Sequence, residues 1–364
     1  MKNTRFPRHL RPANTPLLRL AVLCAVLTGG CLREPGAPLR IEWLCMGTIA
    51  AVQCADRGRA ADAREQAQAV FAGLDRELSA WQGESTLSAV NRAAGSGRTV
   101  AVSPCFAAVL QTALAAAEAS GGAFNPLLGP VMRVWGFNGS TQPPEYPDAR
   151  ELAAAFAAAD WRNVVCEKTA GGAEVSLPAA GMSLDLGAIA KGYAVDQAWA
   201  RLRTAGHTNL LIDLGGNLRA LGEAAPGRGG WRTGVRNPFA TDTLVSLFLL
   251  RDGEAVATSG NYERFVEIQG IRYAHILDGR TGLPVTGMAG VTVIAPDAMT
   301  ADLLSTTLFI LGPEAGVRLL RRYPGCEALW IPDTPDRLTL LATPGFAGRL
   351  TPHGKAPYAL SVLR

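Results

Sequence analysis

The sequence has little charge, few aromatic side chains and very few histidines. Of its 364 residues, 18% are charged, 7% are aromatic and four are histidine. Apart from one apolar run near the N-terminus, no run suggests a segment of the roughly 20 residues that span a bilayer. The 40 glycines and 23 prolines follow no fixed period, which excludes a collagen-like chain. An apolar content of 48% excludes a wholly disordered chain and allows a large buried core.

The cysteines are spaced too widely in the sequence to suggest a metal site. None of the seven cysteines forms a CxxC pair, so their spacing builds no zinc site. In an oxidising compartment Cys45 and Cys54 could form a disulfide, and the sequence alone leaves this open.

The N-terminus has the composition of an export signal. Residues 1–30 contain five basic residues and no acidic one, and their apolar core covers only 20–27. This core is too short to span a bilayer, so we predict a secretory signal peptide over residues 1–30. The small residues before Cys31 resemble a bacterial lipobox, in which the cysteine is acylated and becomes the new N-terminus. The alternative is a plain signal cut near Gly29 or Gly30, or an uncleaved anchor.

The remainder of the chain is nearly neutral. Five of the 35 basic residues lie in the predicted signal, which leaves 30 basic residues against 31 acidic ones. Proteins that bind nucleic acid owe much of their affinity to lysine and arginine contacts with phosphate. We therefore expect no nucleic-acid partner.

The apolar pattern predicts one large α/β domain with mixed sheets and flanking helices, which could divide into two lobes. We place a linker at 31–40, the domain at 41–350 and a C-terminal tail at 351–364. The predicted strands cover 41–54 (one strand or a pair), 163–167, 173–177, 245–250, 265–269 and 291–295. The predicted helices cover 61–81, 106–120, 149–160, 188–204, 301–311 and 314–322.

A first candidate site is LDLGAIAKG, residues 184–192, where an apolar stretch meets an acid, a glycine and a helical pattern. We interpret it as a strand–turn–helix junction, whose helix N-terminus offers free N–H groups to an anion such as phosphate. Lys191 could point at the same anion. The alternative is an ordinary junction in which Asp185 caps the helix. The pattern matches neither the Walker A loop nor the GxGxxG fingerprint.

A second candidate site is ADLLST, residues 301–306. Asp302, Ser305 and Thr306 have the spacing i, i+3 and i+4, so three oxygen-bearing side chains share one helix face. Mg²⁺ prefers such oxygen ligands, with waters and substrate phosphates completing its octahedral shell. The alternative is an acid and two hydroxyls that bond to their own helix.

His275 is the histidine best placed for catalysis. His9 lies in the predicted signal and His353 lies near the C-terminus, which leaves His207 and His275 within the fold. His275 follows a strand-like run and precedes a polar turn, where a general base could be displayed. The alternative is a hydrogen-bonded histidine at the end of a strand.

Glycine-containing loops are the remaining candidates. DLGGN at 213–217 and ATSGNY at 257–262 place small residues after strands, so that a ligand or another backbone can approach closely. GGAFNP at 121–126, followed by large aromatic residues up to 137, combines loop-breaking residues with apolar rings. Such a loop can fill the core or form a wall against a flat aromatic ligand.

The order of these motifs resembles that of one family. MGT, LSAW, NRA, GGAFNP, GP…WGF, LDLGAIAKGYAVD, DLGGN, ATSGNY, HILDGRTG and ADLLST follow one another between Met46 and about Gly312. This series is similar to the ApbE family, the FAD:protein FMN transferases. The resemblance implies a two-lobed mixed α/β fold with the FAD cleft between the lobes. Members also carry lipoprotein signals, which implies anchoring through Cys31 at the periplasmic face of the inner membrane.

The resemblance also implies which residues bind FAD. The acid of LDLG, here Asp185, and the lysine of IAKG, here Lys191, match positions that contact the cofactor. The remaining positions that line the flavin are matched by Met46, Trp81, Ala123, Phe124, Asn125 and Ile276.

A metal site and a base are implied in the same way. The backbone oxygen of Ala188, together with Asp302 and Thr306, matches the ligands of Mg²⁺, and Ser305 lies nearby. His275 matches the histidine regarded as the base that activates the acceptor hydroxyl.

Two positions depart from the family pattern. Asn125 stands where the family usually has aspartate, and it keeps the shape and hydrogen bonding of that residue while losing a charge. Gly279 replaces the usual proline of the HIxDPxTG motif, so we expect a looser turn there.

The predicted reaction transfers FMN from FAD to a threonine or serine hydroxyl of a target protein and releases AMP. The implied acceptors are flavin-bearing subunits of membrane redox complexes. Two alternatives are a FAD pyrophosphatase that uses water as the acceptor, and a flavin-binding lipoprotein without catalytic activity.

Overall fold

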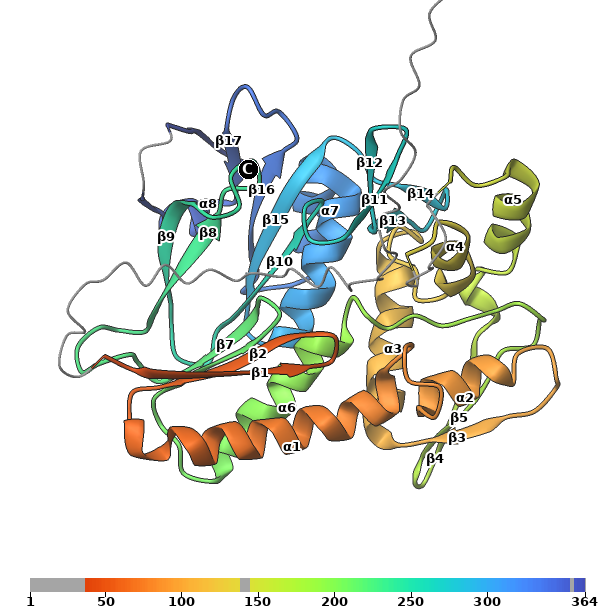
Figure 1. Cartoon of the computed structure of the whole chain (residues 1–364), viewed down its shortest axis with the longest axis horizontal. Coiled ribbons are helices and arrows are strands. Elements are labelled where there is room, and N and C mark those ends of the chain that lie inside the picture. The colour runs from red at the N-terminus through yellow and green to blue at the C-terminus, as the bar shows by residue number, and fades with distance from the viewer. Residues whose placement is uncertain (1–36, 138–144, 354–356, 364) are drawn as a thin grey trace, which may run out of the picture. The chain divides into compact units, whose positions relative to one another are not determined.

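In the described part of the chain, nine strands form one central sheet (Figure 1). The structure is a computed structural model that describes residues 37–137, 145–353 and 357–363, so the predicted signal peptide and Cys31 lie outside it. Neighbouring strands are antiparallel except for the last pair, which is parallel. In sheet order the strands are β1 (Leu39–Cys45), β2 (Thr48–Cys54), β6 (Leu210–Leu214), β7 (Asn217–Leu221), β10 (Ala255–Gly260), β15 (Met288–Ala295), β16 (Glu327–Pro332), β17 (Thr339–Ala342) and β19 (Ala359–Val362).

The middle of this sheet is covered on both faces. Every residue of β15 is buried, and its sequence MAGVTVIA is an almost unbroken apolar run, as expected for such a strand. Val291 and Val293 pack into the main apolar core with the helices, whereas Ile294 packs into a second apolar core. That second core lies against a three-stranded sheet of β8 (Trp231–Arg236), β9 (Leu244–Leu250) and β18 (Thr351–Pro352).

Three helices pack on the sheet face that carries the candidate site. They are α1 (Ala60–Leu78), α6 (Ala190–Thr204) and α7 (Ala298–Leu320). In α1 the residues that face the core follow the predicted helical spacing, since Ala67, Phe71, Leu74 and Leu78 are buried. Helix α6 lies between α1 and α7, so residues at its N-terminus meet residues of α7.

The remaining elements form a smaller helical part and several short ribbons (Figure 1). A third apolar core, around Trp135, joins α4 and the β11–β12 hairpin. The elements are α2 (Thr86–Arg92), α3 (Pro104–Ala119), α4 (Gly129–Val134), α5 (Ala149–Ala157), α8 (Pro344–Ala347), the 3₁₀ turns η1 (Arg57–Arg59) and η2 (Trp161–Asn163), the sheet β3 (Val100–Val102), β5 (Gly172–Ser176) and β4 (Val165–Thr169), and the hairpins β11 (Phe265–Ile268) with β12 (Ile271–Ala274) and β13 (Leu277–Asp278) with β14 (Leu283–Pro284).

The C-terminal segment is part of the fold. Residues 351–364 were predicted to form a tail, but β18 pairs with β9 and β19 adds the last strand of the central sheet beside β17. A strand of four residues is too short for its alternation of apolar and polar residues to be recognised from the sequence. β19 is stabilised by its pairing with β17.

Helix α7 consists of two helical segments joined at Gly312, as the two predicted helices suggest. Gly312 has φ 70° and ψ 179°, and Pro313 follows it. By length and apolar composition α7 could cross a membrane, but it packs against β10 and β15 as a core helix.

The disulfide left open between Cys45 and Cys54 does not form. Cys45 pairs with Thr48 at the turn of the β1–β2 hairpin, whereas Cys54 pairs with Leu39 at its open end. Strands rise about 3.3 Å per residue, so two cysteines six strand positions apart lie far beyond disulfide reach. Both cysteines are free.

Candidate active site

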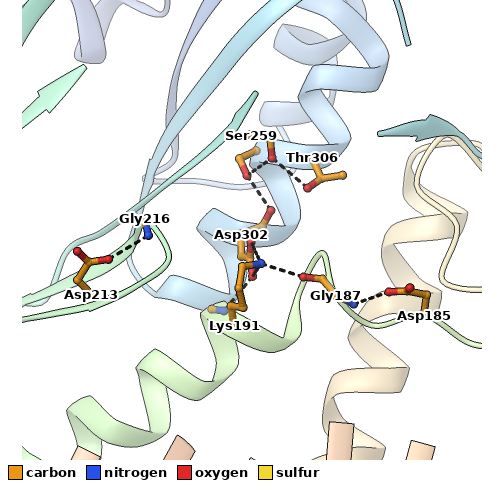
Figure 2. A network of polar contacts seen from close by, with 10 residues as sticks. Asp185, Gly187, Lys191, Asp213, Gly216, Ser259, Asp302 and Thr306 are labelled. Atoms are coloured by element: carbon orange, nitrogen blue, oxygen red, sulfur yellow. Dashed lines mark hydrogen bonds and ion pairs between the residues drawn. The ribbon is translucent and has the colours of Figure 1, made fainter. Parts of the chain in front are cut away.

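The buried carboxylate of Asp302 is the centre of the candidate site (Figure 2). Lys191 Nζ lies 3.4 Å from both carboxylate oxygens and donates to the carbonyl oxygen of Gly187 at 2.9 Å. The backbone N–H of Gly192, in the first turn of α6, donates to Asp302 Oδ2 at 2.9 Å. The anion is therefore stabilised by an ammonium group and by a helix N-terminus together.

The segment before α6 differs from the predicted strand–turn–helix junction. Residues 182–186 lie outside the strands of the described chain, and the side chain of Asn91 bonds to both backbone groups of Leu184. Asp185 Oδ1 accepts the N–H of Gly187 at 2.8 Å, which makes a local turn rather than a cap of α6. The helix begins at Ala190, so Ala188 lies in the turn whose Gly187 carbonyl faces Lys191.

Two residues that are not among the predicted site residues, Gly192 and Asp196, hold α6 and α7 together. A Cβ on Gly192 would lie 2.2 Å from the carbonyl oxygen of Ala298 and 2.7 Å from Asp302 Cβ, so only glycine allows this approach. Asp196 accepts the backbone N–H groups of Ala298 and Met299 and pairs with Arg219 at 2.7 Å. Burial raises the pKa of Asp196, and Arg219 opposes that shift. Asp196 thus fixes the start of the helix that carries Asp302.

Hydroxyl groups line the helix one turn further along α7 (Figure 2). Ser259 Oγ, on β10, lies 2.9 Å from Ser305 Oγ and 3.1 Å from Thr306 Oγ1. Ser305 is buried and donates to the carbonyl oxygen of Asp302 at 2.9 Å. Ser305, one of the predicted metal ligands, therefore uses its hydroxyl proton in a hydrogen bond within its own helix. Ser259 was not among the predicted site residues, although it lies in the ATSGNY motif.

The loop Ala123–Asn125 lies between the candidate anion site and the segment that carries His275. The N–H of Asp185 donates to Pro126 on one side, and the N–H of Gly279 donates to Ala123 on the other. Phe124 is buried in the main apolar core, so its ring fills the fold. Asn125 accepts from Leu127 N–H and donates to Ala159 oxygen at 2.8 Å, a donation that an ionised aspartate could not make.

Gly279 packs tightly instead of loosening its turn. A Cβ at this position would lie 2.3 Å from the carbonyl oxygen of Gly122 and 2.6 Å from Asn125 Cβ. Its N–H donates to Ala123 oxygen at 3.0 Å, and proline has no such donor. The expectation of a looser turn is therefore wrong, because the prediction ignored the loop that packs against Gly279.

Gly279→Ala should destabilise the protein by about 1–3 kcal/mol, because the added methyl group must displace the 122–125 backbone. The free energy of unfolding in urea measures this effect. Gly73→Ala is the matched control, since a Cβ at Gly73 in α1 meets nothing within 4 Å and alanine favours the helix. A Gly279→Ala variant as stable as the wild type would contradict the packing described here.

His275 stands where the β11–β12 hairpin ends. Its N–H donates to the carbonyl oxygen of Arg264, at the start of the hairpin, and its Nδ1 lies 3.0 Å from the same oxygen. That carbonyl can only accept, so Nδ1 carries the proton and Nε2 keeps its lone pair. Although part of His275 is exposed, its pKa is lowered to about 4, chiefly by burial and also by the charges of Arg264 and Lys191, while the hydrogen bond to Arg264 opposes the shift. His275 is thus a neutral ring that lies within electrostatic range of Lys191.

This lowered pKa predicts a pH dependence of stability. Between about 4 and the ordinary value of 6.5, the unfolded chain binds a proton that folded His275 does not bind. This contribution to stability is complete above about pH 6.5 and is lost as the pH falls toward 4. In thermal unfolding across this range, His275→Gln should lose less stability than the wild type. Parallel pH profiles for the two proteins would show that His275 titrates normally.

Three predicted flavin contacts remain, and two of them, Met46 and Trp81, lie in a turn and a loop. Met46 occupies the β1–β2 turn with φ 48°, and a Cβ on the adjacent Gly47 would lie 3.8 Å from the Arg264 guanidinium. This turn therefore lies beside the base of the hairpin that carries His275. Trp81 is 60% exposed in the loop after α1, and Ile276 is buried next to His275.

A buried carboxylate beside a lysine and a helix N-terminus, with a histidine of lowered pKa that feels the charge of that lysine, is the kind of cluster found at enzyme active sites. The ApbE family model matches residues 46–330 of this chain. The chain is 39% identical over 334 residues to a FAD:protein FMN transferase of Treponema pallidum (strain Nichols), covering 87% of this chain and 90% of that protein. A FAD:protein FMN transferase of Klebsiella pneumoniae (strain 342) is 37% identical over 264 residues, or 72% and 78% of the two chains.

Solved structures show the same fold. The flavin transferase ApbE from Vibrio cholerae matches with a TM-score of 0.75 at 26% identity, covering 86% of this chain and 100% of that one. The ApbE protein from Thermotoga maritima matches with a TM-score of 0.72 at 29% identity, covering 81% and 94%. The chain belongs to the ApbE family. The predicted family, mixed α/β fold class and enzymatic nature are thereby confirmed.

Proposed function

We propose that this protein transfers the FMN half of FAD to a threonine or serine hydroxyl of a target protein and releases AMP. The observation that carries the proposal is the buried Asp302 carboxylate, held by Lys191 and the N-terminus of α6, with neutral His275 within electrostatic range of the same lysine. The activity of the relatives from Treponema and Klebsiella supports it.

The chemistry needs one base and a site that neutralises phosphate charge. The acceptor oxygen attacks the phosphorus of the FMN half, a new P–O bond forms, and the bridging P–O bond breaks so that AMP leaves. The proton of the acceptor hydroxyl passes to Nε2 of His275, which is free to accept it because Nδ1 faces the Arg264 carbonyl. Positioning and charge stabilisation provide most of the catalysis in such transfers.

The donor set around Asp302 suits a hard cation. Lys191 Nζ lies among three oxygens, two from Asp302 and one from Gly187, so a positive charge is already favourable there. The described residues contain no cluster of three or more His, Cys, Asp or Glu, which fits Mg²⁺ completed by waters and phosphates rather than an all-protein cage. Asp302, Thr306 and the Ala188 carbonyl would hold Mg²⁺, which neutralises the pyrophosphate when bound.

The FAD itself would be held by the segments that surround this centre. Asp185 and Lys191 would contact the cofactor from the turn before α6 and from its first turn. The partly buried Met46, the exposed Trp81 and the backbone around Ala123, Asn125 and Ile276 would flank the flavin. Because Phe124 is buried in the core, its part would be to support this loop.

The N-terminal segment would place the enzyme at the membrane. Acylation of Cys31 after removal of residues 1–30 would anchor it at the periplasmic face of the inner membrane. Flavin-bearing subunits of membrane redox complexes would then be the acceptors.

The proposal is tested with purified protein, FAD, Mg²⁺ and an acceptor domain that carries a flavinylation threonine. Intact-mass measurement should show the acceptor gaining one FMN, and chelation of the metal with EDTA should prevent this gain. An unmodified acceptor in the presence of Mg²⁺ would overturn the proposal. Retained FAD without any AMP would then favour a flavin-binding protein without catalytic activity.

A further inference from the structure

Three hydroxyl groups form a chain that ends on a backbone carbonyl. Thr306 Oγ1 lies 3.1 Å from Ser259 Oγ, and Ser259 Oγ lies 2.9 Å from Ser305 Oγ. Ser305 Oγ in turn lies 2.9 Å from the carbonyl oxygen of Asp302. Figure 2 shows Ser259 and Thr306 facing each other across the space between β10 and α7.

The direction of every hydrogen bond in this chain follows from its last member. A carbonyl oxygen can only accept, so the single proton of Ser305 is used on Asp302. The contact between Ser305 and Ser259 then needs the proton of Ser259. Because the Ser259 proton is used there, the contact between Ser259 and Thr306 needs the proton of Thr306. The three hydroxyls therefore donate in sequence from Thr306 inward.

The direction of these hydrogen bonds determines whether the Thr306 hydroxyl points a lone pair or a proton away from Ser259. With its proton turned toward Ser259, the Thr306 oxygen has lone pairs available and no hydrogen that points outward. A hydroxyl binds a cation through a lone pair, whereas an outward O–H would repel it. The position of Ser259 is well defined, since β10 pairs with β15 on one side and packs against α7.

We propose that Ser259 is a positioning residue for the divalent cation, because it accepts the Thr306 proton and so keeps the Thr306 oxygen as a ligand. This inference rests on the proposed function, which assigns the cation to Asp302 and Thr306. Ser259 acts through Thr306 and need not touch the cation. It resembles the outer partners of metal ligands, whose loss costs about 10–100-fold in metal affinity.

The test measures the affinity of the purified protein for Mn²⁺ alone, by electron paramagnetic resonance of the free ion, with Mg²⁺ as competitor. Ser259→Ala should weaken Mn²⁺ binding about tenfold or more, and Ser259→Thr, which keeps a hydroxyl, should restore it. Thr258→Val is the matched control. It removes the neighbouring hydroxyl of β10, which bonds to Thr292 at 3.0 Å outside the chain of hydroxyls.

A double-mutant cycle separates this role from general support of the fold. If Ser259 acts through Thr306, then Ser259→Ala should add nothing to the loss of Mn²⁺ affinity in Thr306→Val. Thermal unfolding of each variant shows whether stability and affinity change together. Ser259→Ala with wild-type affinity, or with a full additional loss in the Thr306→Val background, would overturn the inference. If Asp302→Asn and Thr306→Val both keep wild-type affinity, the proposed cation site itself fails.

Discussion

Asp302→Asn should reduce FMN transfer on the order of 10³-fold, because it removes the one carboxylate at the centre of the site. Asparagine is nearly the same size and can still accept the N–H of Gly192, so the α6–α7 contact should survive. Only the charge that faces Lys191, and would face the cation, is lost. The measurement is the initial rate of acceptor modification at saturating FAD and Mg²⁺.

Asp297→Asn is the control for this result. Asp297 is a carboxylate on the same helix, but it caps the N-terminus of α7 by accepting the N–H of Thr300, and asparagine caps equally well. Its transfer rate should match that of the wild type. If Asp302→Asn retains a rate within about tenfold of the wild type, Asp302 does not have the role proposed here.

Replacing His275 by alanine should lower the transfer rate by about 10²–10⁴-fold while FAD still binds, because the acceptor hydroxyl loses its base. Flavin fluorescence titration measures the binding, and acceptor mass measures the transfer. The site around Lys191 and Asp302 stays in place, since the backbone hydrogen bond of residue 275 to Arg264 does not need the ring.

His207→Gln is the matched control for the histidine. His207 is buried at the far end of α6 from Lys191, and its Nε2 lies 2.9 Å from Asp62 Oδ2. This variant should change stability and leave the transfer rate per folded protein unchanged. A His275→Ala protein that transfers FMN at the wild-type rate would exclude His275 as the base.

The elements that can be predicted from the sequence are those with a long apolar pattern or a stop signal within their own residues. The helical spacing of α1, the glycine stop after α3 and the apolar run of β15 all correspond to observed elements. The strand β19 is missed because its four residues depend on pairing with β17. The strand predicted to lead into the junction at 184–192 is not observed, because the backbone of Leu184 bonds to the side chain of Asn91, which is distant in the sequence.

In the candidate site too, residues in local motifs could be predicted, whereas residues that depend on distant partners could not. Asp302, Lys191 and His275 lie in recognisable motifs, and the structure brings the first two together. Their support comes from residues whose importance depends on a distant partner. Asp196 holds the start of α7, and Gly279 packs against the loop at 122–125. Ser259 matters only because α7 places two hydroxyls opposite it, which no spacing within its own motif reveals.

The measurement that tests the central claim most directly is the rate of AMP release from FAD and Mg²⁺, with and without an acceptor domain. A transferase should release AMP only with the acceptor, in a one-to-one ratio with FMN bound to it, because the hydroxyl that His275 activates belongs to the acceptor. Equal AMP release without the acceptor would contradict the account. The protein would then be a FAD pyrophosphatase, in which water takes the place of the protein hydroxyl.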